Sequence, residues 1–286
     1  MNKLILSREE VSLNPTQLKM AESGWGNDAI ENTVVEKITY NSDGLKVKGF
    51  IAYPKNSSEK HPCIIWCRGG IGNSGAIDSF NARGIFGQLA SWGYVVFASQ
   101  YRGNVGGEGK DEFGGSDVND VLNLIPLANE IPQADKNLWG IEGWSRGGMM
   151  TYLALTKTSK FKAAVVTGGI ADLRCNSAES RFMRKLYETS IGTFGTDNFN
   201  SKCHSRSIVN FPEKLSKETP LLLIHGNADT RVLPRDSLDL SVKLLQQNIP
   251  FRLLMLENGD HFLKNHRKEV DTNRKMWFEK YLKNNN

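Results

Sequence analysis

Hydrophobic and polar residues alternate with a period of two near the start of this chain and with a helical period further on. Residues 33–40 and 45–53 are alternating runs, and the Asn-Ser-Asp-Gly sequence at 41–44 between them is typical of a tight hairpin turn. We expect these two runs to form antiparallel strands at the edge of a sheet.

From residue 63 onward, short apolar runs alternate with amphipathic segments. The apolar runs have few polar positions, as strands buried on both faces do. This order predicts a mostly parallel sheet with right-handed crossovers and helices on both faces. The expected strands are 63–67, 94–98, 138–142, 163–167, 220–225 and 251–256, and the expected helices are 78–92, one that starts at Ser116 and carries the apolar series 118–127, 145–158, 234–247 and 265–282.

The fold class is therefore α/β, with an insertion after the strand at 163–167. Residues 171–218 are rich in charged and aromatic side chains and show only patches of helical period. Insertions at the carboxyl ends of strands in open α/β folds usually form lids or pocket walls. We expect one domain at 32–286 with a lid-like insertion at 171–218, and an N-terminal extension at 1–31 that contains one short helix.

The composition indicates a globular protein without nucleic-acid or membrane partners. The 36 Lys and Arg are dispersed among 31 Asp and Glu except at 264–275, where a solvated helix face explains them better than a nucleic-acid patch, since no binding motif accompanies them. No apolar run approaches the roughly 18 residues that span a bilayer. Residues 1–10 have too short an apolar core for a signal peptide, so we expect a cytoplasmic protein.

Cofactor and metal motifs are not found in the sequence. Cys63 and Cys67 lie on one face of an expected strand, where buried free thiols are the default, and no Cys-x-x-Cys pair occurs. The glycine-rich segment 103–109 lacks the lysine and the following helix of a phosphate-binding loop, and no Gly-x-Gly-x-x-Gly turn is present. We expect no metal and no cofactor.

The sequence Gly-Trp-Ser-Arg-Gly at 143–147 joins an expected strand to an expected helix. Gly-x-Ser-x-Gly in that setting is typical of a nucleophile elbow, because a serine on so tight a turn needs neighbours without a Cβ. The turn exposes Ser145 Oγ and aims the Arg146 amide at the same space, where it can stabilise an oxyanion. The alternative is a chance pentapeptide in a chain with 27 glycines.

A serine nucleophile needs a histidine base, and the histidine needs an acid that fixes its tautomer. Of the five histidines, His261 directly follows the last expected strand and is the preferred base, whereas His225 should pack beneath its loop. Asp229 follows the strand at 220–225 and is the preferred acid, because Asp260 adjoins His261 and cannot easily reach the Nδ1 of that ring. Serine, acid and histidine in this order are typical of α/β-hydrolases.

A second oxyanion donor is expected where the strand at 63–67 enters Arg68-Gly69-Gly70. Glycine lets the backbone approach a substrate oxygen closely, so an amide near Gly70 is the candidate. A plain strand-to-helix loop is the alternative reading.

These motifs resemble the catalytic domain of the prolyl oligopeptidase family of serine peptidases, with acylaminoacyl-peptidase and dienelactone-hydrolase relatives close by. The resemblance covers about 31–282 and is carried by Tyr-Arg-Gly at 101–103, the elbow at 143–148, the segment 222–232 and Gly-Asp-His at 259–261. It implies an α/β-hydrolase fold with Ser145 as nucleophile, Asp229 as acid and His261 as base.

The resemblance also indicates candidate substrate contacts. Arg231 matches a family arginine that binds a substrate carbonyl in some members, and a salt bridge within the loop is the alternative. Arg68 stands where relatives carry tyrosine or histidine, and Trp144 adjoins the serine. Family members also carry an N-terminal β-propeller that restricts access to short peptides, and with some thirty residues before the domain we expect that filter to be missing.

We therefore expect a serine hydrolase that cleaves short-peptide or aminoacyl amides through an acyl-enzyme. A carboxylic-ester hydrolase is the alternative, and a hydrolase-fold binding protein without catalysis is a third hypothesis that the intact triad disfavours. The substrate would be a small molecule or a short peptide. The insertion and the N-terminal residues are candidates to wall the site or to pair subunits into a homo-oligomer.

Overall fold

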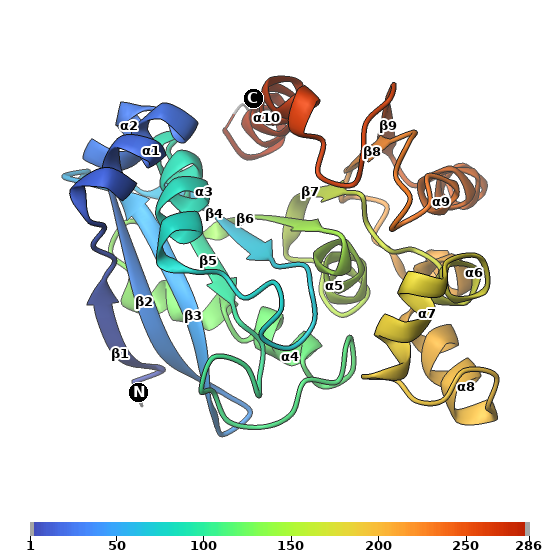
Figure 1. The fold of residues 1–286 in the computed structure, drawn as a ribbon. Coiled ribbons are helices and arrows are strands. Elements are labelled where there is room, and N and C mark those ends of the chain that lie inside the picture. Colours follow the sequence, from blue (N-terminus) through green and yellow to red (C-terminus); the bar gives the residue numbers. More distant parts are fainter. Residues whose placement is uncertain (1–2, 284–286) are drawn as a thin grey trace.

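Nine strands form a single sheet in the computed structural model, which describes residues 3–283 (Figure 1). The strand order is β1-β2-β3-β5-β4-β6-β7-β8-β9. The strands from β5 to β9 run parallel to one another, while β1, β2 and β3 are antiparallel to their neighbours. The bounds are β1 Ile5–Glu10, β2 Thr33–Ser42, β3 Leu45–Pro54, β4 His61–Cys67, β5 Val95–Ser99, β6 Ala134–Trp144, β7 Phe161–Thr167, β8 Leu221–Gly226 and β9 Phe251–Leu256.

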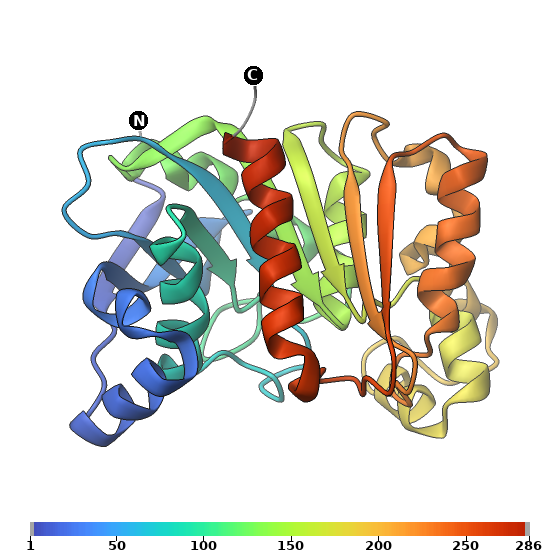
Figure 2. The ribbon, with the colours of Figure 1, turned by 90° about the horizontal axis from the view of Figure 1, so that it is seen from above.

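Helices cover both faces of this sheet, which confirms the α/β prediction. The helices α3 and α10 lie on one face and α5 on the other (Figure 1), and Figure 2 shows α10 running along the sheet. Successive residues of the buried strands feed two separate cores: Cys63 and Ile65 pack on the α5 side, and Ile64 packs on the α3 side. The helices are α1 Pro15–Trp25, α2 Asn27–Glu31, α3 Ser79–Ser91, α4 Val118–Leu122, α5 Arg146–Leu155, α6 Leu173–Glu179, α7 Arg181–Glu188, α8 Asp197–Arg206, α9 Arg235–Gln246 and α10 Arg267–Phe278.

The expected hairpin is present, but its strands are not at the edge of the sheet. The strands β2 and β3 are joined by Asp43 and Gly44, both at positive φ (53° and 83°), as a hairpin turn with left-handed central residues requires. The edge is β1, which pairs antiparallel with β2 and which the sequence pattern did not predict. Only Ile5 of β1 is buried, so this edge strand has no alternation to detect.

Two further expectations about helices were wrong. The helix expected from Ser116 is two short pieces, α4 and a 3₁₀ turn at Ile125–Glu130, because Pro126 cannot donate a helical hydrogen bond and disfavours helical angles in the residue before it. Ser116 is not the cap residue either: Asp117 precedes α4, and its carboxylate accepts other hydrogen bonds.

The insertion at 171–218 is more regular than its sequence indicated. It contains α6, α7 and α8, which gather beside α5 (Figure 1). Each of these helices starts at a side chain that caps backbone amides, namely Asp172, Ser180 and Thr196. The helices are short and the segment is polar, so their period was hard to detect, whereas the caps were present in the sequence.

Within residues 3–283 no helix combines the length and the hydrophobicity needed to cross a bilayer. Cys63 and Cys67 are buried free thiols, as the strand pattern predicted.

Candidate active site

Ser145 lies on a tight turn between β6 and α5, at φ 59° and ψ −121°. The flanking glycines are required by close backbone contacts: a Cβ on Gly143 would come 2.1 Å from the Gly147 carbonyl oxygen, and one on Gly147 would come 1.9 Å from the Cys67 oxygen. The Ser145 amide donates to the Thr167 carbonyl at 3.0 Å, which ties the turn to β7. The residue is thus held at a strained position, as a nucleophile elbow requires.

Asp229 and His261 lie in direct contact. His261 Nδ1 is 2.7 Å from Asp229 Oδ2. A carboxylate can only accept, so Nδ1 carries the hydrogen and Nε2 is left with a lone pair. Trp144 Nε1 donates to the His261 carbonyl at 3.1 Å, which holds the backbone of this histidine beside the elbow.

The other lone pairs of Asp229 are also occupied. Its Oδ1 accepts from the Arg231 amide at 2.8 Å and the Val232 amide at 3.1 Å. Its Oδ2 lies 3.3 Å from His225 Nε2 in addition to His261. Burial alone would raise the pKa of the Asp229 carboxyl, but the hydrogen bonds from the two histidines and from the Arg231 amide hold that pKa below its usual range. Asp229 is therefore a carboxylate fixed in orientation.

His225 is a second neighbour of Asp229 for which the sequence predicted only packing beneath the loop. Its side chain is fully buried, as expected. Its Nε2 is 3.0 Å from the Val232 carbonyl oxygen, which can only accept, so Nε2 carries the hydrogen. Its Nδ1 then accepts from the Ser237 hydroxyl at 2.7 Å. The ring is a fixed donor towards Asp229, and its place at the end of β8, on the loop of the acid, is the signal that could have indicated this contact.

Asp260, the competing acid, is exposed, and its Oδ1 accepts from the Phe262 amide at 3.1 Å. No hydrogen bond joins the Asp260 and His261 side chains within residues 3–283. The geometry therefore favours Asp229 as the partner of the histidine.

Arg146 and Gly70, the two candidate oxyanion donors, line the same cavity as Ser145. The Arg146 amide is the first of α5, so it has no acceptor within the helix. Gly69 and Gly70 line the same cavity as Ser145, and a Cβ on Gly69 would come 3.4 Å from the Ser145 Cβ. Gly70 itself has φ 71° and could not carry a Cβ, which would come 2.2 Å from the Ser74 oxygen. The pair suits the two donors of an oxyanion hole.

The Arg146 side chain is bonded to the glycine loop at residues 69–70. Its guanidinium is fully buried between the rings of Tyr101 and Phe113, at 4.7 and 4.6 Å from their centroids. It pairs with Asp111 at 2.5 Å and Asp117 at 2.7 Å, and it donates to the Gly70 carbonyl at 3.1 Å. The two rings and the two carboxylates come from the segment between β5 and α4, and the sequence pattern did not indicate that they contact Arg146.

Arg68 does not occupy the substrate-contact position that the sequence suggested. Its side chain is fully buried and lies outside the cavity that contains Ser145. It donates to the Gln100 carbonyl and to the carbonyls of Gly69 and Gly72, and its guanidinium is 5.0 Å from the Tyr101 ring centroid. Arg68 therefore supports the glycine loop, and a contact with substrate is no longer expected.

The cavity above Ser145 has a volume of about 530 Å³. Ser145, His261, Gly70, Trp144 and Arg231 all line it. Arg231 forms no salt bridge within residues 3–283 and stacks on Phe262 at 4.7 Å and on Phe182 at 5.5 Å, so the alternative of a salt bridge within the loop is not observed. The far wall is apolar and comes from the insertion and the residues before it: Ile170, Phe182, Met183 and Leu186.

No group of three or more His, Cys, Asp or Glu side chains suited to a metal ion occurs within the described residues. Ser145, His261, Arg146 and Gly70 line the cavity, and Asp229 contacts His261 from outside it.

Replacing Asp111 by asparagine should change the acid dependence of stability. Burial would raise the pKa of Asp111, but the Arg146 hydrogen bond and charge lower it to about 2. A folded-state pKa below the unfolded value means that Asp111 stabilises the fold above about pH 4 and that this contribution is lost as the pH falls towards 2. The contribution is about 2 kcal/mol in total, of which about 1 kcal/mol is lost between pH 5 and pH 3.

Urea unfolding of the wild type and Asp111→Asn at these two pH values measures the difference. We expect the difference in the free energy of unfolding between the two proteins to decrease by about 1 kcal/mol from pH 5 to pH 3. The exposed Glu218, which lies outside the helices and strands, is replaced by glutamine as the control and should leave the difference in unfolding free energy from wild type constant. A constant difference for Asp111→Asn would contradict the proposed ion pair.

Comparisons with known proteins agree with this geometry. A sequence model of the prolyl oligopeptidase family matches residues 81–285. The Bacillus subtilis (strain 168) protein described as uncharacterized peptidase YtmA is 33% identical over 227 residues, which are 79% of this chain and 85% of that protein. The dipeptidyl-peptidase 5 of Aspergillus oryzae is 27% identical over 264 residues, 87% of this chain.

The solved structure of Pyrococcus horikoshii acylaminoacyl peptidase superposes with a TM-score of 0.76 at 24% identity and covers 96% of this chain, which confirms the fold. The present chain spans only 35% of the Aspergillus protein and 45% of the Pyrococcus chain. The family model covers residues 81–285, and YtmA is 33% identical over 79% of this chain. The chain therefore belongs to the prolyl oligopeptidase family.

Proposed function

We propose that this chain is a serine hydrolase that cleaves short-peptide or aminoacyl amide bonds through an acyl-enzyme on Ser145. The observation that carries the proposal is the 2.7 Å contact between His261 Nδ1 and Asp229. It leaves Nε2 as the ring nitrogen that can take a proton, in a side chain that lines the same cavity as Ser145. The match to the prolyl oligopeptidase family and to a relative named as a peptidase supports this proposal.

In the proposed reaction, Ser145 Oγ attacks the substrate carbonyl carbon while its proton passes to His261 Nε2. The carbonyl oxygen becomes an oxyanion, stabilised by the amides of Arg146 and Gly70. The C–N bond then breaks, and Nε2 returns the proton to the leaving amine. Water attacks the acyl-enzyme, gives its proton to Nε2, and Ser145 Oγ recovers that proton as the carboxylic acid leaves.

The apolar wall of the cavity supports an acyl group with a hydrophobic side chain. The lid-like insertion at 171–218 of the catalytic domain at 32–286 contributes Phe182 and Met183 to it. Relatives named dipeptidyl-peptidase and acylaminoacyl peptidase support an amide over an ester. An ester hydrolase remains the second candidate, because the same proton from His261 Nε2 can be given to a leaving alcohol. A homo-oligomer stays a prediction of the sequence.

Turnover of matched substrates tests the proposal. Aminoacyl and prolyl p-nitroanilides should be hydrolysed, together with the p-nitrophenyl esters of the same acyl groups, which are intrinsically more reactive. Ester turnover without any anilide turnover would favour the ester hydrolase. Absence of both, with no labelling by a fluorophosphonate probe, would favour the binding protein without catalysis.

A further inference from the structure

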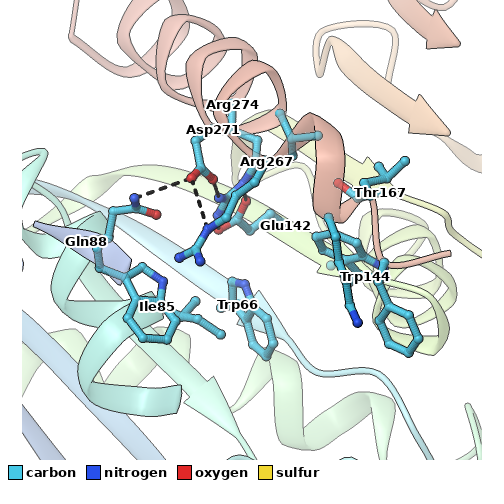
Figure 3. A pocket seen from close by; sticks show the side chains of 15 residues that line it. Trp66, Ile85, Gln88, Glu142, Trp144, Thr167, Arg267, Asp271 and Arg274 are labelled. Atoms are coloured by element: carbon cyan, nitrogen blue, oxygen red, sulfur yellow. Dashed lines mark hydrogen bonds and ion pairs between the residues drawn. The ribbon is translucent and has the colours of Figure 1, made fainter. Parts of the chain in front are cut away.

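A second cavity, lined by Trp144 and by residues of α3 and α10, lies next to the cavity of Ser145 (Figure 3). Its volume is about 260 Å³. Trp66, Ile85, Trp144 and Phe262 line both this cavity and the cavity that contains Ser145. The two spaces are therefore neighbours that share one wall.

Three tryptophans from distant parts of the chain enclose the second cavity. Trp66 is the penultimate residue of β4 and Trp144 is the last of β6, whereas Trp25 ends α1 in the N-terminal extension. The Trp25 ring packs directly on Gly84 of α3, where a Cβ would come 2.3 Å from the ring, and meets Phe80 edge to face at 5.4 Å. The N-terminal residues thus build the outer wall of this cavity, and its apolar surface suits an aliphatic or aromatic group.

The floor of the cavity is a closed ionic network. Arg274 binds Glu142 through two hydrogen bonds of 2.8 and 2.7 Å and Asp271 through one of 2.7 Å. Gln88 donates to the other oxygen of Asp271 at 3.4 Å. Figure 3 shows a dashed line from Asp271 of α10 to Gln88 of α3. Arg274 is buried, so it does not belong to the solvated face expected from the sequence, and both carboxylates are neutralised by it.

Two cations at the rim are not neutralised in this way. Arg267 has a half-exposed side chain, stacks on Trp25 at 4.7 Å, and approaches Asp271 only to 4.0 Å. Lys264 is exposed and lies 5.7 Å from the Phe262 ring centroid, with no carboxylate within 4.0 Å among residues 3–283. With three cations against two carboxylates in the lining, the rim favours an anionic group.

The position of the cavity relative to His261 indicates which part of a substrate it receives. The insertion contributes Phe182, Met183 and Leu186 to the cavity of Ser145 but none to the second cavity, so its apolar wall is assigned to the acyl group. The leaving amine must stay beside His261 Nε2, which protonates it. Phe262 and Leu263, directly after His261, line the second cavity, and Trp144 donates to the His261 carbonyl. The second cavity therefore lies against the segment that carries His261, the residue that protonates the leaving amine in the proposed reaction.

We propose that this cavity binds the leaving group of a short peptide, an apolar or aromatic C-terminal residue whose free carboxylate pairs with Arg267 and Lys264. The inference rests on the proposed function. It gives the N-terminal extension a role in substrate choice and predicts a preference for peptides with a free carboxyl terminus over the same peptides with a terminal amide.

The test compares two short peptides that end in phenylalanine, one with a free carboxylate and one amidated. The wild type should cleave the free acid with a kcat/KM roughly ten- to a hundredfold higher, the range of one or two charge-assisted hydrogen bonds. In the double variant Arg267→Gln, Lys264→Gln this preference should disappear, because the rate for the free acid falls to that for the amidated peptide. Lys268→Gln, the next residue on α10 and outside the cavity lining, is the matched control.

An equal rate for the two peptides in the wild type, or a preference that survives in the double variant, would overturn the inference. If the enzyme hydrolyses only esters, the same two peptides are measured as inhibitors of ester turnover, and the free acid should bind more tightly in the wild type alone. Loss of all p-nitroanilide and ester turnover in the wild type would instead refute the proposed function. The two failures are therefore distinguishable.

Discussion

Replacement of Ser145 by alanine should lower kcat by about 10⁴-fold or more and abolish covalent labelling by a fluorophosphonate probe. The reason is chemical: no other hydroxyl is held on the turn between β6 and α5, where φ is 59° and the Arg146 amide begins the helix. Alanine keeps the Cβ and removes only Oγ, so the elbow should keep its shape. Unfolding by urea should therefore change by no more than about 1 kcal/mol.

A p-nitrophenyl ester assay and gel detection of the labelled protein measure this prediction. Ser201→Ala, an exposed serine on α8, is the control and should retain both labelling and turnover. Labelling that persists in Ser145→Ala at the wild-type rate would show that another residue is the nucleophile.

Much of the fold could be predicted because its signals are local. Strands buried on both faces are continuous apolar runs, and β9 was predicted with the bounds that the structure has, Phe251–Leu256. The strand β1 could not be found, since only Ile5 among its residues is buried and its pairing partner lies thirty or so positions away. The helix α7 lies where the sequence showed a patch of helical period, whereas α6 and α8 were missed because each is short, although Asp172 and Thr196 marked their starts.

Some residues of the candidate site could likewise be predicted from local signals in the sequence, and others could not. Ser145, Asp229 and His261 were selected because each follows a strand, and the carboxyl ends of parallel strands meet at one edge of the sheet. The burial of Arg68 depends on the Gln100 carbonyl, which belongs to the loop after the neighbouring strand β5, so adjacency to the glycine pair was misleading. The partners of Arg146 likewise come from a loop without a periodic pattern, and only tertiary structure brings them together.

Replacement of Asp229 by asparagine should lower kcat by about 10⁴-fold while leaving KM nearly unchanged. Asparagine is nearly isosteric with aspartate, but its two terminal atoms differ. The amides of Arg231 and Val232 both donate to the Oδ1 position, so the side-chain oxygen must stay there. The NH₂ group must then occupy the Oδ2 position, 2.7 Å from His261 Nδ1.

An NH₂ group at that position can only donate, which forces His261 Nδ1 to become the acceptor and moves the ring hydrogen to Nε2. A protonated Nε2 cannot take the Ser145 proton, so acylation slows although the side chain packs as before. The same NH₂ group would also face the Nε2 hydrogen of His225, whose orientation Val232 and Ser237 fix. A few kcal/mol of stability should be lost with that contact.

The pH dependence of kcat and the free energy of unfolding separate these effects. Asp260→Asn is the matched control, because Asp260 adjoins His261 in the sequence but is exposed, and its carboxylate accepts from the Phe262 amide. This variant should keep kcat within a few-fold of wild type. A large loss of kcat in Asp260→Asn, together with a near-normal kcat in Asp229→Asn, would identify Asp260 as the acid. The carboxylate that fixes the His261 tautomer is the one whose removal lowers kcat.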